Sequence, residues 1–402
     1  MRVFNSILVL AGLFSASSVF AELTLVEAQK QAYALDPNLQ YLYRQDSTSA
    51  LKIQHSGRFS NPEVAVELDN LGNANLKDLD GPSYAFQLSQ AVPLNNKRRL
   101  RVDLATAKQT SNLLAIQQRQ AQLNAEVRLC LAVWSVAEQR RKLAVDDRDI
   151  AQSQARLLQE KFRAGRVVQS DAERAQALAT EANQKVALYQ SEAMQRKATC
   201  SLSVGNLGHE PIPLPTTFPI NTSKTLSQRH VLQVQQEADI QYRLANAERL
   251  PEMTLSVGTR RYQQTGDMVL LAGVSMPIPL FDQNQVARAD AQNELEQANY
   301  LVTVQQKRSV ILLENAKQRL QSHQQLLTTV DQVVIPAAQE SLRIAQLAYQ
   351  SGKTGLLEWI DARRVWRESR ERRLDIWLNI QQAIAEIERE IPPSALSVGQ
   401  TS

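Results

Sequence analysis

Apolar residues recur at helical spacing through most of the chain, in unusually long runs. Residues 95–162 contain neither Pro nor Gly, and residues 283–349 contain no Gly and a single proline, Pro336. If each run is helical throughout, it spans about 100 Å. Shorter helical patterns follow at 168–202 and 356–390 and would each return over about 50 Å. The pattern predicts two long helical hairpins, with a kink at Pro336.

The apolar stripes on these helices are narrow. Positions such as Leu100, Leu104 and Ala107 share one face, while Gln, Ala and charged residues fill the others. Narrow stripes favour coiled-coil packing, in which each helix touches its neighbours without a thick core. Composition agrees, because 13 Gly and 14 Pro in 402 residues supply few turns. This excludes a many-looped α/β enzyme and a small disulfide-rich domain.

A different pattern precedes each helical hairpin, with apolar and polar residues alternating along the chain. The alternation covers residues 64–69, 84–89 and 253–258, whereas residues 268–276 are apolar on both faces. Alternation over roughly 9–10 residues is typical of a strand that crosses a membrane, with one face toward lipid and one toward water. A half-buried sheet of a soluble protein shows the same alternation, so both interpretations stay open at this point.

The membrane interpretation assigns the two faces of the first strand pair. Toward lipid we expect Val64, Val66, Leu68, Phe86 and Leu88, and toward the lumen Glu67, Asp69 and Gln87. Four strands cannot close a barrel, and open strand edges cannot lie in lipid. Closure at eight or more strands therefore requires several chains, and a trimer would supply twelve strands.

The two halves of the chain read alike. Three landmarks recur at nearly constant spacing: residues 61–69 with 250–258, 90–94 with 276–280, and 162–166 with 349–353. Such self-similarity indicates a duplicated unit. The fold class is therefore mainly α with a membrane β-barrel, in two tandem repeats that each combine a β-hairpin with a long coiled-coil helical hairpin.

The N-terminal segment has the features of a secretory signal. Arg2 precedes an apolar run at residues 7–14, and small residues end the segment at Ala21. No later apolar run is long enough for a membrane-spanning helix, so an exported protein would be periplasmic, secreted or an outer-membrane barrel. The net charge of +4 comes from interspersed signs rather than from a basic stripe, so we expect no nucleic-acid partner.

Motifs of catalysis and metal binding are missing from the sequence. It has no glycine-rich nucleotide loop and no zinc-protease motif. His55, His209, His230 and His323 share no metal-ligand spacing, and the two cysteines form no Cys-x-x-Cys pair. We expect no catalytic residue, no cofactor and no resident metal, which disfavours an enzyme.

With these features in place, the chain resembles the TolC-like family of outer-membrane efflux ducts, from residue 23 to about residue 390. Within that family it is similar to the CzcC-type branch for heavy-metal cations. The matching residues are Asn61-Pro-Glu63, Leu88-Ser-Gln90 with Pro93-Leu94, Lys97-Arg98 with Arg101, and the proline-rich residues 277–284.

The resemblance implies a homotrimer with a twelve-stranded barrel in the lipid of the outer membrane and a helical barrel in the periplasm. The family works with a periplasmic adaptor protein and an inner-membrane pump of the resistance-nodulation-division type. For this chain it implies export of cations such as cobalt, zinc or cadmium. Export of organic compounds or of another metal is the alternative within the family. A periplasmic coiled-coil scaffold is the alternative from another class, but it leaves the strands unexplained.

On this basis the chain divides into consecutive segments. These are a signal peptide (1–21), an N-terminal helical segment (22–60), β-hairpin 1 (61–94), helical hairpin 1 (95–202), an equatorial linker (203–230), a helix (231–249), β-hairpin 2 (250–280), helical hairpin 2 (281–392) and a C-terminal tail (393–402). Residues 70–82 and 262–267 would form the outward-facing loops.

The resemblance also implies roles for the two hairpin tips. Adaptors of the family dock there, which makes Ala164, Gly165, Arg166, Ser351, Gly352 and Lys353 the candidate contact residues. Family ducts close at the tips through bonds between hairpins, which makes Asp171, Tyr349, Thr354, Glu358 and Asp361 the candidate gate residues. Thr354 stands where a family member has Arg, so one salt bridge would be missing. Glu358 and Asp361 share a helical face and could form a cation-attracting ring in a trimer. Acids near a helix N-terminus are also explained by the helix dipole alone.

The two cysteines lie equally far from Gly165, one on each side. In an antiparallel hairpin that turns at Gly165, Cys130 and Cys200 would stand at the same height. An oxidising periplasm would allow a disulfide there, closing a loop of about 70 residues worth about 4 kcal/mol. Two unpaired cysteines acting as small apolar residues are the alternative.

Overall fold

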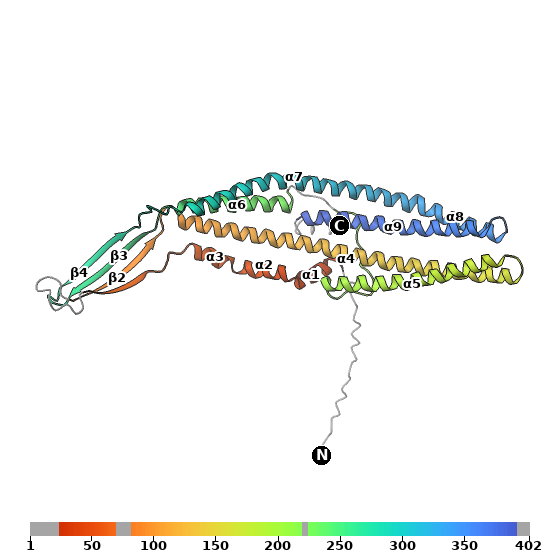
Figure 1. The fold of residues 1–402 in the computed structure, drawn as a ribbon, viewed down its shortest axis with the longest axis horizontal. Coiled ribbons are helices and arrows are strands. Elements are labelled where there is room, and N and C mark those ends of the chain that lie inside the picture. Colours follow the sequence, from red (N-terminus) through yellow and green to blue (C-terminus); the bar gives the residue numbers. More distant parts are fainter. Residues whose placement is uncertain (1–23, 70–81, 219–223, 392–402) are drawn as a thin grey trace, which may run out of the picture.

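The computed structural model describes residues 24–69, 82–218 and 224–391. It is strongly elongated, with a β-sheet at one end and helices along the rest (Figure 1). The expected signal peptide (1–21), the C-terminal tail (393–402) and nearly all of the first outward-facing loop lie outside the described residues.

The sheet has four antiparallel strands, β1 (Glu63–Asp69), β2 (Ser83–Val92), β3 (Met253–Tyr262) and β4 (Met268–Ser275). Their order in space equals their order in sequence, so β1 and β4 are the two edges. β4 pairs with β3 along its length although its sequence does not alternate. The fold therefore leaves one unpaired strand edge on each side of the sheet.

Strand register separates the two faces of this sheet. Val66 pairs with Phe86, which pairs with Thr259, whereas Glu67 pairs with Ala85, which pairs with Arg260. Because partners across a ladder point to the same side, one face is apolar and the other is polar. The apolar face carries Val64, Val66, Leu68, Tyr84, Phe86, Leu88, Leu255, Val257, Leu270 and Val274, all of them exposed or half-buried in the single chain.

Two helical hairpins extend from the sheet. The first consists of α4 (Lys97–Arg163) and α5 (Gln169–Val204). The second consists of α7 (Gln285–Thr329), a π-helical turn (Val330–Val334), α8 (Ile335–Gln350) and α9 (Leu356–Glu390). The π-helical turn ends immediately before the first turn of α8, which contains Pro336. Pro336 has no N–H to donate to the preceding turn and its ring crowds the carbonyl four residues earlier, so the helix is irregular directly before the proline.

Shorter helices complete the rod at the sheet end. They are α1 (Leu25–Leu35), α2 (Pro37–Ser47), α3 (Ser49–Ser56) and α6 (Leu226–Ala247). Their starts follow from local chemistry. Thr24 and Thr225 form capping boxes with the third residue of their helices, and Asp36 caps α2 ahead of Pro37.

The helices near the sheet are layered in the order α3, α4, α6, α7, because α4 packs on both α3 and α6, and α6 packs on α7. Toward the far end α4 instead packs on α5 and α9, and α8 packs on α9. In Figure 1, α1 to α3 and α5 follow one another along one side of the rod, with α7 and α8 along the opposite side. These two sides are the lateral edges of the chain, in line with β1 and β4.

The apolar core consists of several small clusters along the rod instead of one large core. One lies where α1 meets α4 and α5, and includes Val127, Leu131 and Val204. Another joins α7 to α9 through Leu320, Ile380 and other aliphatic residues. Among the described residues, no helix combines the length and the apolar character that a membrane span requires.

Candidate functional site

The far end of the rod is formed by two helical turns of the same geometry. At the first tip the backbone N–H of Arg166 donates to the carbonyl of Lys161 at 2.8 Å, and at the second the N–H of Lys353 donates to the carbonyl of Ala348 at 2.8 Å. Gly165 and Gly352 adopt φ values of 69° and 74°, which favour glycine. The chain thus ends both long helices with the same capping motif.

The expected adaptor-contacting residues are all exposed at these tips. They are Ala164, Gly165 and Arg166 at the first tip and Ser351, Gly352 and Lys353 at the second. A Cβ atom built on either glycine would meet no other atom within 4 Å. The surface around each turn is therefore open to a partner, and each tip presents one basic side chain.

Tyr349, a candidate gate residue, is buried at the base of the second tip. Its ring stacks on Trp359 with centroids 5.2 Å apart, and the Lys161 ammonium of the first hairpin lies 4.5 Å from its centroid. Burial, with a smaller contribution from the charge of Asp171, raises the pKa of Tyr349. Its hydroxyl bonds to no described residue, so packing and the cation–π contact connect the two hairpins here.

Of the other candidate gate residues, Asp171 lies in the first turn of α5, and the remaining three lie between α8 and α9. Thr354, Glu358 and Asp361 line a groove of about 830 Å³ together with the exposed apolar residues Ile344 and Leu357. Glu358 accepts the N–H of Gly355 at 2.7 Å and so caps its own helix, while Asp361 pairs with the exposed Arg364. The structure therefore brings both carboxylates to one groove, and each also has a local partner.

A buried ionic cluster that the sequence analysis did not identify joins the two hairpins below the tips. Asp147 on α4 lies 3.3 Å from Arg363 and 3.7 Å from Arg367 on α9, and Arg363 donates to Gln154 at 2.7 Å. Asp147 and Arg363 are both nearly inaccessible. Burial lowers the pKa of Arg363, opposed by the charge of Asp147.

A sequence signal for this cluster existed. Asp147 stands on the buried stripe of α4 with Ala144, Ala151 and Leu158, at helical spacing. An acid on an apolar stripe requires a cation on the facing helix, because an unpaired buried charge is costly.

A second buried network fixes the middle of the rod. Arg128 on α4 donates to both carboxylate oxygens of Glu388 on α9, at 2.7 and 2.8 Å, and to Gln381 at 3.1 Å. At a similar level of α4 the structure joins Cys130 and Cys200 in a disulfide, with Cα atoms 5.3 Å apart. Both links tie α4 to other helices at the height where α1 packs.

The polar face of the sheet carries the remaining charged residues of interest. Arg260 lies 3.6 Å from Glu67 and 3.3 Å from Asp69, so one cation is shared by two acids. No group of three or more His, Cys, Asp or Glu side chains in the described part of the chain could hold a metal ion. The charged side chains of this face therefore pair with one another across strands β1 and β3.

Comparison with known proteins gives matches that agree with this geometry. Residues 223–390 match the family model of the outer membrane efflux protein. The cobalt-zinc-cadmium resistance protein CzcC of Cupriavidus metallidurans is 24% identical over 378 residues, which cover 85% of this chain and 88% of the relative. The chain is therefore similar to outer-membrane efflux proteins, in its second half by family model and over most of its length by the relative CzcC.

Solved channel structures share the fold of this TolC-like chain from end to end. The outer membrane protein VceC of Vibrio cholerae superposes with a TM-score of 0.75 at 14% identity, over 90% of this chain and 94% of VceC. CusC superposes with a TM-score of 0.73 at 16% identity, over 92% and 91%. The matched family consists of outer membrane efflux proteins, and the matched structures are outer-membrane proteins and channels.

Proposed function

We propose that the TolC-like chain is one subunit of the outer-membrane duct in a tripartite efflux system of the resistance-nodulation-division type, and that the system exports heavy-metal cations. The observation that carries the proposal is the four-stranded sheet with one apolar face, one polar face and two open edges, continuous with a long helical rod. Such a sheet has no stable place in lipid until its edges are paired.

Three copies solve this edge problem. Head-to-tail repetition of the β1 to β4 order pairs β1 of one copy with β4 of the next and closes a barrel of twelve strands. The same repetition places the exposed apolar residues of the two lateral edges, such as Leu202 on α5 and Tyr300 on α7, against neighbouring copies. Each subunit then contributes two units of strand pair and helical hairpin, in the segments proposed from the sequence.

The proposed cargo is a divalent cation of the cobalt, zinc or cadmium type. Support comes from the similarity to CzcC, a cobalt-zinc-cadmium resistance protein, and from the acids along the proposed path. Glu67 and Asp69 lie on the polar sheet face, and Glu358 and Asp361 lie near the tip. Rings of carboxylates attract cations and repel anions, so three copies of each acid would favour a cationic cargo.

The tips and the groove beside them are the proposed contact and gate. Arg166 and Lys353, with the adjoining exposed residues of both turns, would contact the periplasmic adaptor. Asp171, Tyr349, Thr354, Glu358 and Asp361 would control the opening between hairpins. Charge reversal at both Arg166 and Lys353 should weaken adaptor crosslinking, while reversal of the exposed Arg243, remote from the tips on α6, should leave crosslinking unchanged.

A conductance measurement tests the duct and its cation preference together. The purified protein is inserted into planar bilayers, and the reversal potential is measured in a salt gradient. We expect cation-selective channels whose selectivity falls in a Glu358→Gln, Asp361→Asn variant, and loss of metal resistance in a strain lacking the gene. A protein that forms no channel and leaves metal resistance unchanged would contradict the proposal.

A further inference from the structure

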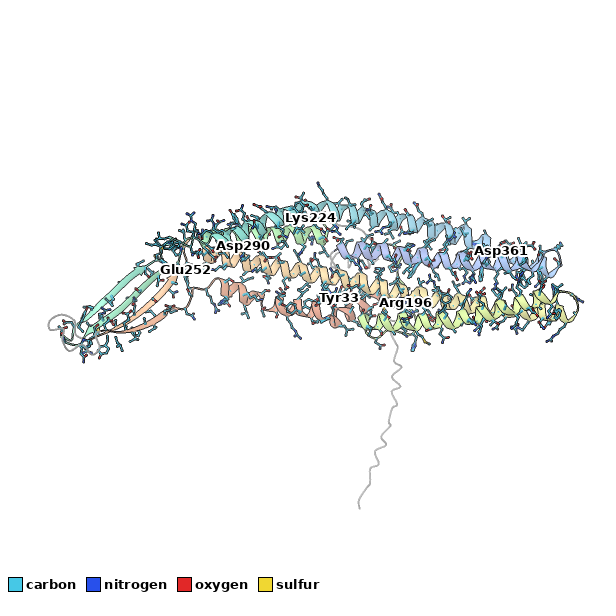
Figure 2. The ribbon with its side chains drawn as sticks, viewed as in Figure 1. Tyr33, Arg196, Lys224, Glu252, Asp290 and Asp361 are labelled. Atoms are coloured by element: carbon cyan, nitrogen blue, oxygen red, sulfur yellow. A yellow bond between two sulfur atoms is a disulfide. The ribbon has the colours of Figure 1, made fainter. Side chains whose placement is uncertain are left out.

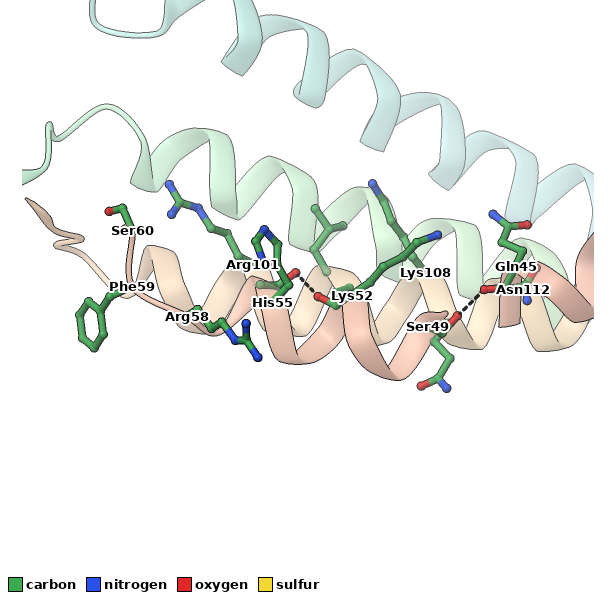
Figure 3. A pocket seen from close by; sticks show the side chains of 14 residues that line it. Gln45, Ser49, Lys52, His55, Arg58, Phe59, Ser60, Arg101, Lys108 and Asn112 are labelled. Carbon is green, nitrogen blue, oxygen red and sulfur yellow. Dashed lines mark hydrogen bonds between the residues drawn. The ribbon is translucent and has the colours of Figure 1, made fainter. Parts of the chain in front are cut away.

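A basic groove lies where the sheet meets the helices, between α3 and the first turns of α4 (Figure 3). Its volume is about 570 Å³. Its basic side chains are Lys52, His55, Arg58, Arg101 and Lys108, and no Asp or Glu of the described chain lines it. The basic groove is therefore a concentrated positive patch on a lateral edge of the molecule.

Most of this charge is unpaired inside the chain. Arg101 lies 3.1 Å from Glu252, which neutralises it in part. Lys52, Arg58 and Lys108 are exposed and take part in no salt bridge within the described residues. In Figure 3 the side chains of Lys52 and Lys108 extend from two different helices, so both α3 and α4 contribute to the positive potential.

The opposite lateral edge carries the complementary charge. Asp282, Asp290, Glu294 and Glu296 are exposed at the start of α7 or directly before it, and they form no salt bridge with any described residue. The one basic residue in this stretch, Arg288, donates to the Asn246 side chain of α6 at 2.8 Å and so turns inward. Residues 282–296 thus form an acidic edge, and Asp290 is labelled on it in Figure 2.

Chain connectivity sets both patches at the same height. The basic groove lies directly before β1, since α3 ends at Ser56 and β1 begins at Glu63. The acidic edge lies directly after β4, since β4 ends at Ser275 and α7 begins at Gln285. When β1 of one copy pairs with β4 of the next, α3 and α7 of the two copies must therefore meet.

We propose that the basic groove of each copy receives the acidic edge of the neighbouring copy, and that this contact fixes the head-to-tail order of assembly. The partner is a second copy of this chain, chosen by charge complementarity between two unpaired patches of opposite sign at equal height. The inference rests on the proposed head-to-tail duct, but it assigns a specific electrostatic contact that strand pairing does not require. Complementary charges of this kind select partners and fix register.

Engineered cysteines test the contact directly in the full-length protein in membranes. A Lys52→Cys, Asp290→Cys variant should form intermolecular disulfides up to the trimer on mild oxidation. The native cysteines do not compete, because Cys130 and Cys200 are bonded to each other. The matched control pairs Lys52→Cys with Asp239→Cys, because Asp239 is exposed on α6 away from the lateral edges, and it should lose the intermolecular crosslink.

Charge exchange tests the electrostatic part. Lys52→Glu with Arg58→Glu should lower the trimer yield, as should Asp290→Lys with Glu294→Lys, and all four changes together should restore it. If trimers form, but the Lys52→Cys, Asp290→Cys variant gives no crosslink and the fourfold exchange restores nothing, this inference is wrong. The proposed duct would be unaffected by that result. Phospholipid that co-purifies with the wild type and is lost from the Lys52→Glu, Arg58→Glu variant, again without rescue, would overturn it in favour of a lipid headgroup. A wild-type protein that stays monomeric would refute the proposed duct as well.

Discussion

Replacing Glu388 by Gln should be among the most damaging single changes in the rod. The carboxylate accepts two hydrogen bonds from Arg128, at 2.7 and 2.8 Å, and both side chains are only 2–3% exposed. The amide keeps the shape of the carboxylate but removes its charge. Arg128 is then a buried cation whose other partner, Gln381, is neutral. Breaking a buried pair in this way costs about 3–5 kcal/mol.

An exposed pair in the same chain supplies the matched control. Arg343 also makes two hydrogen bonds to one carboxylate, that of Glu340, at 2.7 and 2.8 Å. The side chains of Arg343 and Glu340 are 59% and 54% exposed, so water replaces the lost partner. Glu340→Gln should therefore destabilise the protein far less than Glu388→Gln does. Bond geometry is alike in the two pairs, which differ in burial and in that Arg343 and Glu340 lie on one helix while Arg128 and Glu388 join two.

Denaturant unfolding in detergent, followed by circular dichroism, measures both costs. Replacing both members of the buried pair by Met should recover most of the loss, because removing two charges together leaves neither unpaired. Equal costs for Glu388→Gln and Glu340→Gln would refute the reasoning. So would a double Met variant as unstable as the single Gln variant.

The remaining predictions concern three other features. Cys200→Ser should lower the free energy of unfolding by about 4 kcal/mol on the chain-entropy model, and peptide mass spectrometry without reduction should find the disulfide in the wild type but not in the variant. Val66→Arg should reduce membrane insertion by roughly 2–4 kcal/mol while Glu67→Arg is tolerated, as measured by the folded fraction in outer-membrane preparations; the reverse order would reverse the face assignment. Burial raises the pKa of Tyr33 from 10.0 to about 12, which means that the folded state favours the neutral phenol. The resulting contribution to the free energy of unfolding is complete below pH 10 and is lost as the pH rises toward 12. Alkaline unfolding should therefore depend less steeply on pH in Tyr33→Phe, and an unchanged slope would contradict this assignment.

Periodicity was sufficient to predict the elongated helical architecture because few residues in the long runs oppose it. The run at residues 95–162 has no helix breaker, and α4 occupies nearly all of it. Strand β4 was harder to predict, because Leu270 and Leu271 point to opposite faces and give no alternation. Its strand state follows from pairing with β3, which is a tertiary contact that local sequence does not contain.

The ionic partners of the acids at the candidate site could not be predicted from the sequence, because they depend on how the helices fold and pack. The spacing of Glu358 and Asp361 placed them on one face of a helix, but Arg364 as a partner of Asp361 emerged only from the structure. The Asp147–Arg363 contact joins α4 to α9, which are far apart in sequence. Both helices carry many acidic and basic residues, so the sequence alone allows many pairings between them. Burial singles out this pair, and burial depends on how α4 and α9 pack.

The positions of the buried polar links also suggest where the rod can move. At the middle of α4, the disulfide and the Arg128–Glu388 pair act at one level, and the disulfide is covalent. Nearer the tips, the single carboxylate of Asp147 pairs with both Arg363 and Arg367, and the contact with Arg367 is at 3.7 Å. Separating the hairpins at the tips breaks the Asp147 cluster, the neighbouring Arg370–Asp146 pair, the Lys161–Tyr349 contact and an apolar cluster around Leu158 and Trp359, none of which is covalent. We therefore expect an opening motion to be confined to the part of the rod beyond Asp147, with the disulfide level as its fixed base.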